Sequence, residues 1–195
     1  MTLSRASHSA GEVYRASRST VHPVNRRSLV QLSAVIVTAA VALDQSTKWW
    51  AESALDNGRL INVLPTLEFD LSYNSGFSFG TGSGFGPWIG LIVIAMCGFL
   101  GWLIVNAETR LRAAIAAMIL GGAISNLLDR IFRADDGVLS GEVVDFIDVT
   151  WYAVFNVADI FVVCGAIAFG ANEIWLSRQV TAEIDAVESI GNGTT

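Results

Sequence analysis

Residues 154–170 read VFNVADIFVVCGAIAFG, an apolar stretch with two polar side chains, Asn156 and Asp159, close to its start. The apolar run continues to Leu176, and a helix needs about 20 residues to cross a membrane. A carboxylate inside such a helix is costly, so an ionisable residue in a membrane span is a candidate for function. The stretch therefore predicts a transmembrane helix and raises the question of which residue works with Asp159.

Three further apolar stretches indicate that the chain crosses a membrane four times. Hydrophobic residues make up 52% of the 195 residues and charged residues 15%, against about 25% charged residues in soluble domains. We predict an all-α membrane protein with four transmembrane helices and a small extracytoplasmic β-sheet. The predicted spans are residues 28–50, 87–107, 111–130 and 154–176. They form a membrane domain over residues 26–177, between a disordered cytoplasmic tail at 1–25 and a second, frayed tail at 178–195.

The distribution of arginines predicts the orientation of the spans. Arginines precede the first span, and Arg110 and Arg112 lie in the turn between the second and third spans. The positive-inside rule then places both termini in the cytoplasm and the 51–86 and 131–153 loops outside. The net charge is −6 and the sequence shows no basic patch of the kind that binds nucleic acid, so we expect no nucleic-acid partner. Arg26 followed by an apolar run also fits a cleavable signal peptide, but the three later spans favour a retained helix.

The first outward loop contains a strand-like pattern of side chains. Residues 67–72 alternate apolar and polar side chains, which predicts a strand in a small sheet on the outer membrane surface. In the third span, Ala117, Gly121 and Ser125 recur every four residues, a row that lets another helix approach closely. Cys97 and Cys164 lie in apolar helices with no metal-ligand spacing, so we predict packing roles for them and no metal or cofactor.

Polar residues from three spans are expected to lie at one depth, near the outer surface. They are Asp44, Lys48, Asn126, Asp129, Arg130, Asn156 and Asp159. Asp44 and Lys48 are one helical turn apart and can pair, and on their own they are equally well explained as a helix-end ion pair. Seven such residues converging at one level indicate a polar site.

The loop before the fourth span adds two further carboxylates, Asp145 and Asp148, and either can fold back towards Asp159. Two aspartates that share one proton can activate water and protonate a carbonyl oxygen, as in aspartic proteases. The spacing does not separate Asp145 from Asp148, and it leaves a cation site or a proton-coupled transporter open. Polar residues are few in the inner halves of the helices, which opposes a transporter, while a non-enzymatic scaffold has no use for facing acids.

Five motifs in order carry a resemblance to a known family. They are DQSTK (44–48), NSGFSFG (74–80), GGAISNLLDR (121–130), VVDFID (143–148) and FNVAD (155–159). Across residues 28–176 the chain resembles the lipoprotein signal peptidases, or signal peptidase II, which are four-helix aspartic proteases of bacterial membranes. The resemblance implies cleavage of the signal peptide from a lipid-modified precursor, just before a cysteine that bears a diacylglyceryl group. It also implies a monomer that contacts membrane lipids.

The resemblance also implies roles for individual residues. Asp145 and Asp159 would form the catalytic dyad, and Asn126 and Arg130 would hold the substrate or the dyad. The remaining supporting residues would be Asn74, Asp129, Asn156, Asp44 and Lys48. Two positions depart from the family pattern: Ser125 stands where the family usually has glycine, and Phe77 stands where it has a small residue.

Overall fold

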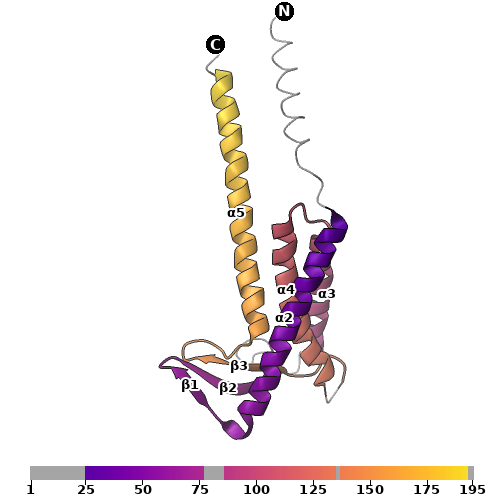
Figure 1. Cartoon of the computed structure of the whole chain (residues 1–195), viewed down its shortest axis with the longest axis vertical. Coiled ribbons are helices and arrows are strands. Elements are labelled where there is room, and N and C mark those ends of the chain that lie inside the picture. Colours follow the sequence, from indigo (N-terminus) through magenta and orange to yellow (C-terminus); the bar gives the residue numbers. More distant parts are fainter. Residues whose placement is uncertain (1–24, 77–85, 135–136, 193–195) are drawn as a thin grey trace, which may run out of the picture.

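The computed structural model describes residues 25–76, 86–134 and 137–192, and Figure 1 shows their arrangement. Within these residues, four helices are long and apolar enough to cross a membrane. They are α2 (Arg26–Ala54), α3 (Gly86–Val105), α4 (Arg110–Phe132) and α5 (Val157–Asn192). The predicted fold class is confirmed. The predicted tail at residues 1–25 lies outside the described residues except for Asn25, whose side chain accepts a hydrogen bond from the Arg27 backbone N–H.

Helix α4 is the centre of the helical bundle, because it packs against α2, α3 and α5. The small residues on α4 make this possible. A Cβ atom built on Gly121 would lie 2.7 Å from the Ala40 Cβ atom of α2, and one on Gly122 would lie 2.5 Å from the Ala158 carbonyl oxygen of α5. Both approaches are closer than a larger side chain allows. The contact at Gly121 confirms the close packing predicted for its row, whereas Gly122 lies beside that row.

A three-stranded antiparallel sheet lies at one end of the bundle (Figure 1). Its strands are β1 (Ile61–Leu64), β2 (Leu67–Asn74) and β3 (Val143–Val149), in that order, with a short 3₁₀ turn, η1 (Asp56–Gly58), between α2 and β1. Strand β2 confirms the strand predicted for residues 67–72. The rings of Trp50, Phe69 and Phe146 pack together and attach the sheet to the end of α2.

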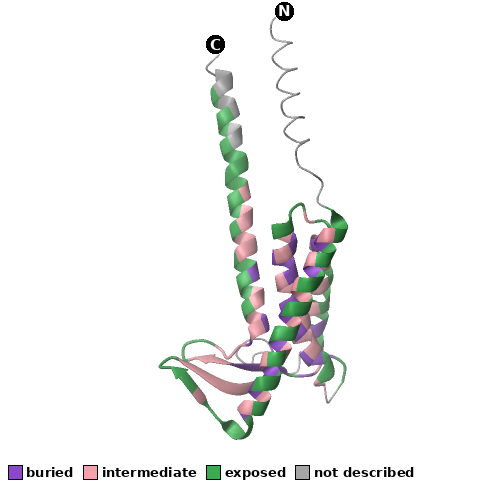
Figure 2. Cartoon of the chain, viewed as in Figure 1, coloured by how far each residue is buried: buried purple, intermediate pink, exposed green. Residues whose placement is uncertain are grey.

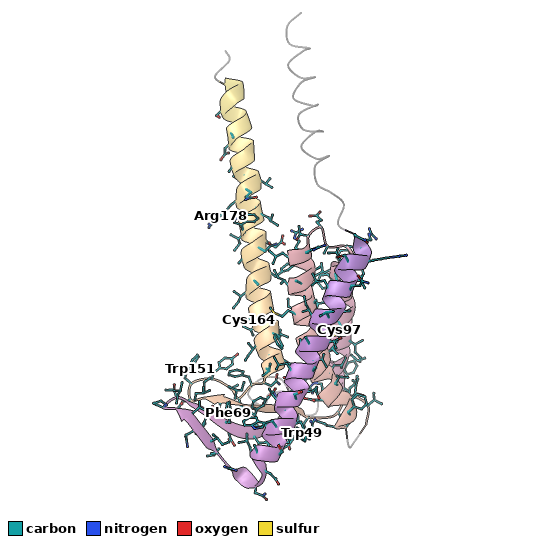
Figure 3. The ribbon with its side chains drawn as sticks, viewed as in Figure 1. Trp49, Phe69, Cys97, Trp151, Cys164 and Arg178 are labelled. Carbon is teal, nitrogen blue, oxygen red and sulfur yellow. The ribbon has the colours of Figure 1, made fainter. Side chains whose placement is uncertain are left out.

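Exposed apolar side chains cover the outside of the helices, as expected for surfaces that face lipid. Figure 2 shows buried residues gathered on α2 and α4 and near the sheet, whereas the described part of α5 has few buried residues. In Figure 3, Trp49 and Trp151 lie at the sheet end of the molecule. Cys97 and Cys164 are free thiols on α3 and α5.

The C-terminal segment differs from the prediction. We expected residues 178–195 to fray, but α5 continues without interruption to Asn192, far beyond the predicted span (Figure 1). Residues 178–190 contain neither proline nor glycine, and Gln, Ala and Glu favour helices. The polar composition of this segment is therefore compatible with a solvated extension of a helix that the membrane span has already nucleated.

Candidate active site

The chain folds back between β3 and α5 and brings Asp145 close to Asp159. The backbone of Phe155 pairs with that of Ile147, with N···O distances of 3.0 and 2.9 Å, and this bridge reverses the chain direction. Asp145 is 3% exposed on β3, and Asp159 lies in the first turn of α5. Asn156 contacts both residues: its Nδ2 atom donates to Asp145 Oδ1 at 2.6 Å, and its backbone N–H donates to Asp159 Oδ2 at 3.2 Å.

Every oxygen of the two carboxylates accepts a hydrogen bond from an amide. Asp145 Oδ2 accepts from Asn74 Nδ2 at 3.1 Å, in addition to the bond from Asn156. Asp159 Oδ1 accepts from Asn126 Nδ2 at 2.9 Å. Neutral amides orient a carboxylate without forming an ion pair with it, so the two acids keep the freedom to exchange a proton.

Burial dominates the electrostatics of Asp145. Desolvation and the neighbouring Asp159 carboxylate raise the pKa of Asp145 from 3.8 to about 6. The hydrogen bonds from Asn74 and Asn156 and the charge of Lys48 lower this pKa, but they do not offset the burial. Asp145 therefore retains a proton closer to neutral pH than an exposed aspartate does.

The register of β3 separates Asp145 from Asp148. Successive side chains of a strand point to opposite faces, so residues three apart lie on different faces of the sheet. Asp145 is paired with Ser72 and faces α5, whereas Asp148 is paired with Glu68. The geometry therefore places Asp145 rather than Asp148 beside Asp159, a distinction that spacing alone left open.

Beneath the two acids lies a buried ion cluster centred on Lys48, which is completely inaccessible to solvent. Its Nζ atom lies 2.8 Å from Asp44 Oδ2 and 2.7 Å from Asp129 Oδ2, and it donates to Asn126 Oδ1 at 2.8 Å. Asp44 also accepts from the backbone N–H of Ala158 at 2.7 Å, which ties the start of α5 to α2. The predicted pairing of Asp44 with Lys48 is thus present, within a larger cluster.

Two side chains complete this cluster. The Ser125 hydroxyl donates to Asp44 Oδ2 at 2.7 Å. Gln45 Nε2 donates to the Ser125 hydroxyl at 3.1 Å and to Asp129 Oδ1 at 3.0 Å. Asp129 Oδ2 in turn accepts from the Val144 backbone N–H at 3.3 Å, directly beside Asp145 in the chain. The cluster therefore connects α2 and α4 to both segments that carry the acids.

Arg130 lies at the edge of the site, and one of its guanidinium nitrogens has no hydrogen-bond partner among the described residues. The residue is 5% exposed, and its Nη2 atom donates to the Gly76 carbonyl oxygen at 2.7 Å. Its Nη1 atom is buried and has no hydrogen-bond partner among the described residues. The guanidinium interacts electrostatically with Asp145 and Asp129. Phe77, which follows Gly76 and departs from the family pattern, lies outside the described residues.

Comparison with known proteins identifies the family. A family model described as signal peptidase (SPase) II matches residues 36–175. The chain belongs to the signal peptidase II family. A lipoprotein signal peptidase of Bifidobacterium adolescentis is 42% identical over 143 residues, which are 73% of this chain and 75% of that protein. Another, from Hydrogenovibrio crunogenus, is 36% identical over 149 residues and covers 71% and 83% of the two chains.

Solved structures agree with the signal peptidase II assignment at the level of the fold. A bacterial membrane enzyme determined by the in meso method aligns with a TM-score of 0.64 and 27% identity, over 73% of this chain and 87% of that one. As a member of the signal peptidase II family, the chain is a protease, and the family implies prolipoproteins as its substrates. Its four apolar helices are consistent with a multi-pass bacterial membrane protein.

The structure brings the predicted signal peptidase site residues together. Contacts link Asp145, Asp159, Asn126, Asn156, Asn74, Asp129, Asp44 and Lys48 in one network, and Arg130 lies at its edge. Their individual roles stay predictions. Sequence reasoning missed two members, because Gln45 was not selected and Ser125 was assigned only to packing. The signal for Gln45 was available, since it is a polar residue in a membrane span beside Asp44.

Proposed function

We propose that the chain is a membrane aspartic endopeptidase that cleaves diacylglyceryl-modified prolipoproteins just before the lipidated cysteine. Asp145 and Asp159 are the catalytic dyad. The observation that carries this proposal is the pair of acids from β3 and α5, which are joined through Asn156 and whose hydrogen-bond donors among the described residues are amides. Such a pair is suited to sharing one proton, because two like charges at close range do not both ionise readily.

The chemistry that we propose uses both protonation states of the pair. The ionised aspartate takes a proton from a water molecule, whose oxygen attacks the carbonyl carbon of the scissile peptide bond. The protonated aspartate donates its proton to the carbonyl oxygen, which gives a neutral tetrahedral intermediate. When the carbon–nitrogen bond breaks, the leaving nitrogen takes the proton that came from water, and the hydroxyl proton returns to the other aspartate. The dyad ends each cycle as it began.

The free donor of Arg130 supports a role in binding the substrate. Its Nη1 atom is buried at the edge of the site and unpartnered among the described residues. A buried donor without a partner is unfavourable by about 1–3 kcal/mol, and a peptide carbonyl or an ester oxygen of the substrate would satisfy it. Arg130 would thus orient the substrate chain against the dyad without taking part in proton transfer.

The position of the dyad suits a substrate that is itself embedded in the membrane. The acids lie where the helices meet the sheet, and the arginine distribution predicts that this end faces outward, with both termini in the cytoplasm. Water reaches the dyad from that side, while the signal peptide and its two acyl chains remain in the lipid beside the apolar helix surfaces. We further propose that the chain acts as a monomer, in contact with membrane lipids and without a cofactor.

The proposal is tested with purified protein and a synthetic precursor in lipid nanodiscs. Precursor with and without the diacylglyceryl group is incubated in water enriched in oxygen-18, and the products are analysed by mass spectrometry. We expect cleavage of only the modified precursor, immediately before its cysteine, with one oxygen-18 atom in the new carboxylate of the signal peptide. Hydroxylamine traps an acyl-enzyme intermediate as a hydroxamate. Because we propose that water attacks the peptide bond directly, added hydroxylamine should yield no hydroxamate. Cleavage elsewhere, equal cleavage of the unmodified precursor, or a trapped hydroxamate would each contradict the proposal.

A further inference from the structure

Lys48 is completely buried near the dyad, and every donor of its ammonium group is used. An ammonium has three N–H donors and no acceptor. Here the three acceptors are Asp44, Asp129 and the Oδ1 atom of Asn126. All three donors are therefore engaged beneath the dyad, and Lys48 acts on the two catalytic acids through other groups and through its charge.

The contact with Asn126 fixes the direction of that amide. Because Lys48 can only donate, the Asn126 oxygen must face it, and the Asn126 Nδ2 atom then faces Asp159 at 2.9 Å. The reverse orientation would place the amide N–H₂ against the ammonium and the amide oxygen against the carboxylate. Both of those contacts are repulsive, so the cation selects one of the two orientations.

The same oxygen also orders the second amide of the site. Asn126 Oδ1 accepts a further hydrogen bond from Asn156 Nδ2 at 3.1 Å, and this N–H₂ group donates to Asp145 at 2.6 Å. A short chain of contacts therefore runs from Lys48 through Asn126 to Asp159, and through Asn126 and Asn156 to Asp145. Lys48 thus fixes the direction of Asn126, and through Asn126 it supports an orientation of Asn156 that the Asp159 backbone N–H also fixes by donating to Asn156 Oδ1 at 3.0 Å.

We propose that Lys48 is a positioning residue for catalysis, which fixes the amides of Asn126 and Asn156 and whose charge favours the singly ionised form of the dyad. This inference rests on the proposed function of Asp145 and Asp159. It gives Lys48 a role beyond that of a helix-end ion pair with Asp44, because the ion pair alone would be indifferent to the direction of either amide.

The charged groups around Lys48 determine the direction of its electrostatic effect. Asp44 on α2 and Asp129 on α4 pair with Lys48 directly. Asp145 on β3 and Asp159 on α5 interact with its charge at longer range. Two arginines of the same region interact with Asp129, namely Arg130 on α4 and Arg133, which follows α4 and contacts Asp129 at 3.4 Å. In this setting the Lys48 charge lowers the pKa of Asp145. Removing the charge must therefore raise the pH at which the active, singly ionised dyad forms. Removing the negative charge of Asp44 must act in the opposite direction.

The test is the pH dependence of kcat/KM for precursor cleavage in nanodiscs, with thermal unfolding as a second readout. For Lys48→Met we expect a loss of activity of about 100-fold, as for a misplaced catalytic group. We also expect the acidic limb of the profile to move to higher pH. For Asp44→Asn we expect the acidic limb to move down. The matched control is Gln45→Met, which removes a neutral member of the same cluster and should lower the unfolding temperature without moving the acidic limb.

Each outcome decides between positioning and plain structural support. If Lys48→Met keeps the acidic limb of the wild type, or if all three variants shift it in the same direction, Lys48 is not a positioning residue. If Lys48→Met does not fold, the double variant Lys48→Met/Asp44→Asn removes both members of this ion pair. Asp44 is then not left as an unpaired buried charge. For that variant we expect reduced kcat with little change in KM, and wild-type kcat would overturn the proposal. Wild-type protein that fails to cleave the precursor would instead overturn the proposed function itself.

Discussion

Replacing Gly122 by alanine should displace α5 from α4 at the level of the dyad. The new Cβ atom would lie 2.5 Å from the Ala158 carbonyl oxygen and 2.9 Å from the Val162 Cγ2 atom. Ordinary van der Waals contact begins at 3.4 Å, so relieving the backbone clash requires a shift of 0.9 Å, the difference between 3.4 and 2.5 Å. A rotamer change cannot relieve the clash with Ala158, because the atom that it meets belongs to the backbone.

This displacement acts on the dyad directly, because Ala158 precedes Asp159 and Asn126 lies one turn beyond Gly122. The hydrogen bond between Asn126 Nδ2 and Asp159 Oδ1 is 2.9 Å long. Lengthening it by the same shift takes it well beyond the distances typical of N–H···O hydrogen bonds, which are about 2.7–3.2 Å. We expect Gly122→Ala to lower cleavage about 100-fold and to destabilise the fold by about 1–3 kcal/mol.

The assays are precursor cleavage in nanodiscs and thermal unfolding of the same samples. Gly101→Ala is the matched control, because Gly101 lies in α3 and a Cβ atom there would have no neighbour within 4 Å. It should leave cleavage unchanged and stabilise the helix by up to about 1 kcal/mol. Wild-type cleavage by Gly122→Ala, or equal losses in both variants, would show that close approach of α4 and α5 does not position the dyad.

Three further predictions concern protonation, a hydroxyl and a surface ion pair. The pKa of Asp145 is raised to about 6, so the folded state gains stability from this proton below about pH 4. That stability should be lost as the pH rises through about 6, by up to about 3 kcal/mol. The free energy of unfolding should therefore depend less on pH for Asp145→Asn than for the wild type. An unchanged pH dependence would contradict the raised pKa of Asp145. Ser125→Gly removes a donor to Asp44 and should destabilise by about 1–3 kcal/mol, which denaturant unfolding measures; no change would mean that the hydroxyl adds nothing. Arg112→Gln breaks the partly exposed ion pair with Glu173. It should lower the free energy of unfolding by less than about 1 kcal/mol in the same assay. A larger loss would show that this ion pair stabilises the fold more than an exposed pair does.

Residue spacing predicted the four spans and the depth of the polar residues because both depend on local sequence and membrane thickness. It did not select Asp145 over Asp148, since that choice depends on the register of β3 against β2. The family motifs supplied the choice, and the alternation of side chains along the strand explains it physically.

Other features could not be predicted because they depend on distant contacts. The Ser125 hydroxyl contacts Asp44, a residue 81 positions away, so a local pattern of small residues indicated only packing. The extension of α5 to Asn192 was missed for a different reason. Its polar composition was interpreted as disorder, although polar residues of good helix propensity also prolong a helix that is already formed.

In the proposed reaction Asp145 and Asp159 together activate water, so the rates of their asparagine variants measure this role. Asp145→Asn, Asp159→Asn and the matched control Asp148→Asn are compared with the wild type in single-turnover cleavage of a diacylglyceryl-modified precursor. Loss of a general acid or base costs about 10²–10⁴-fold. We predict a loss of that size for Asp145→Asn and Asp159→Asn and a wild-type rate for Asp148→Asn. A folded Asp145→Asn or Asp159→Asn variant that cleaves at the wild-type rate would show that the two acids do not form a catalytic dyad.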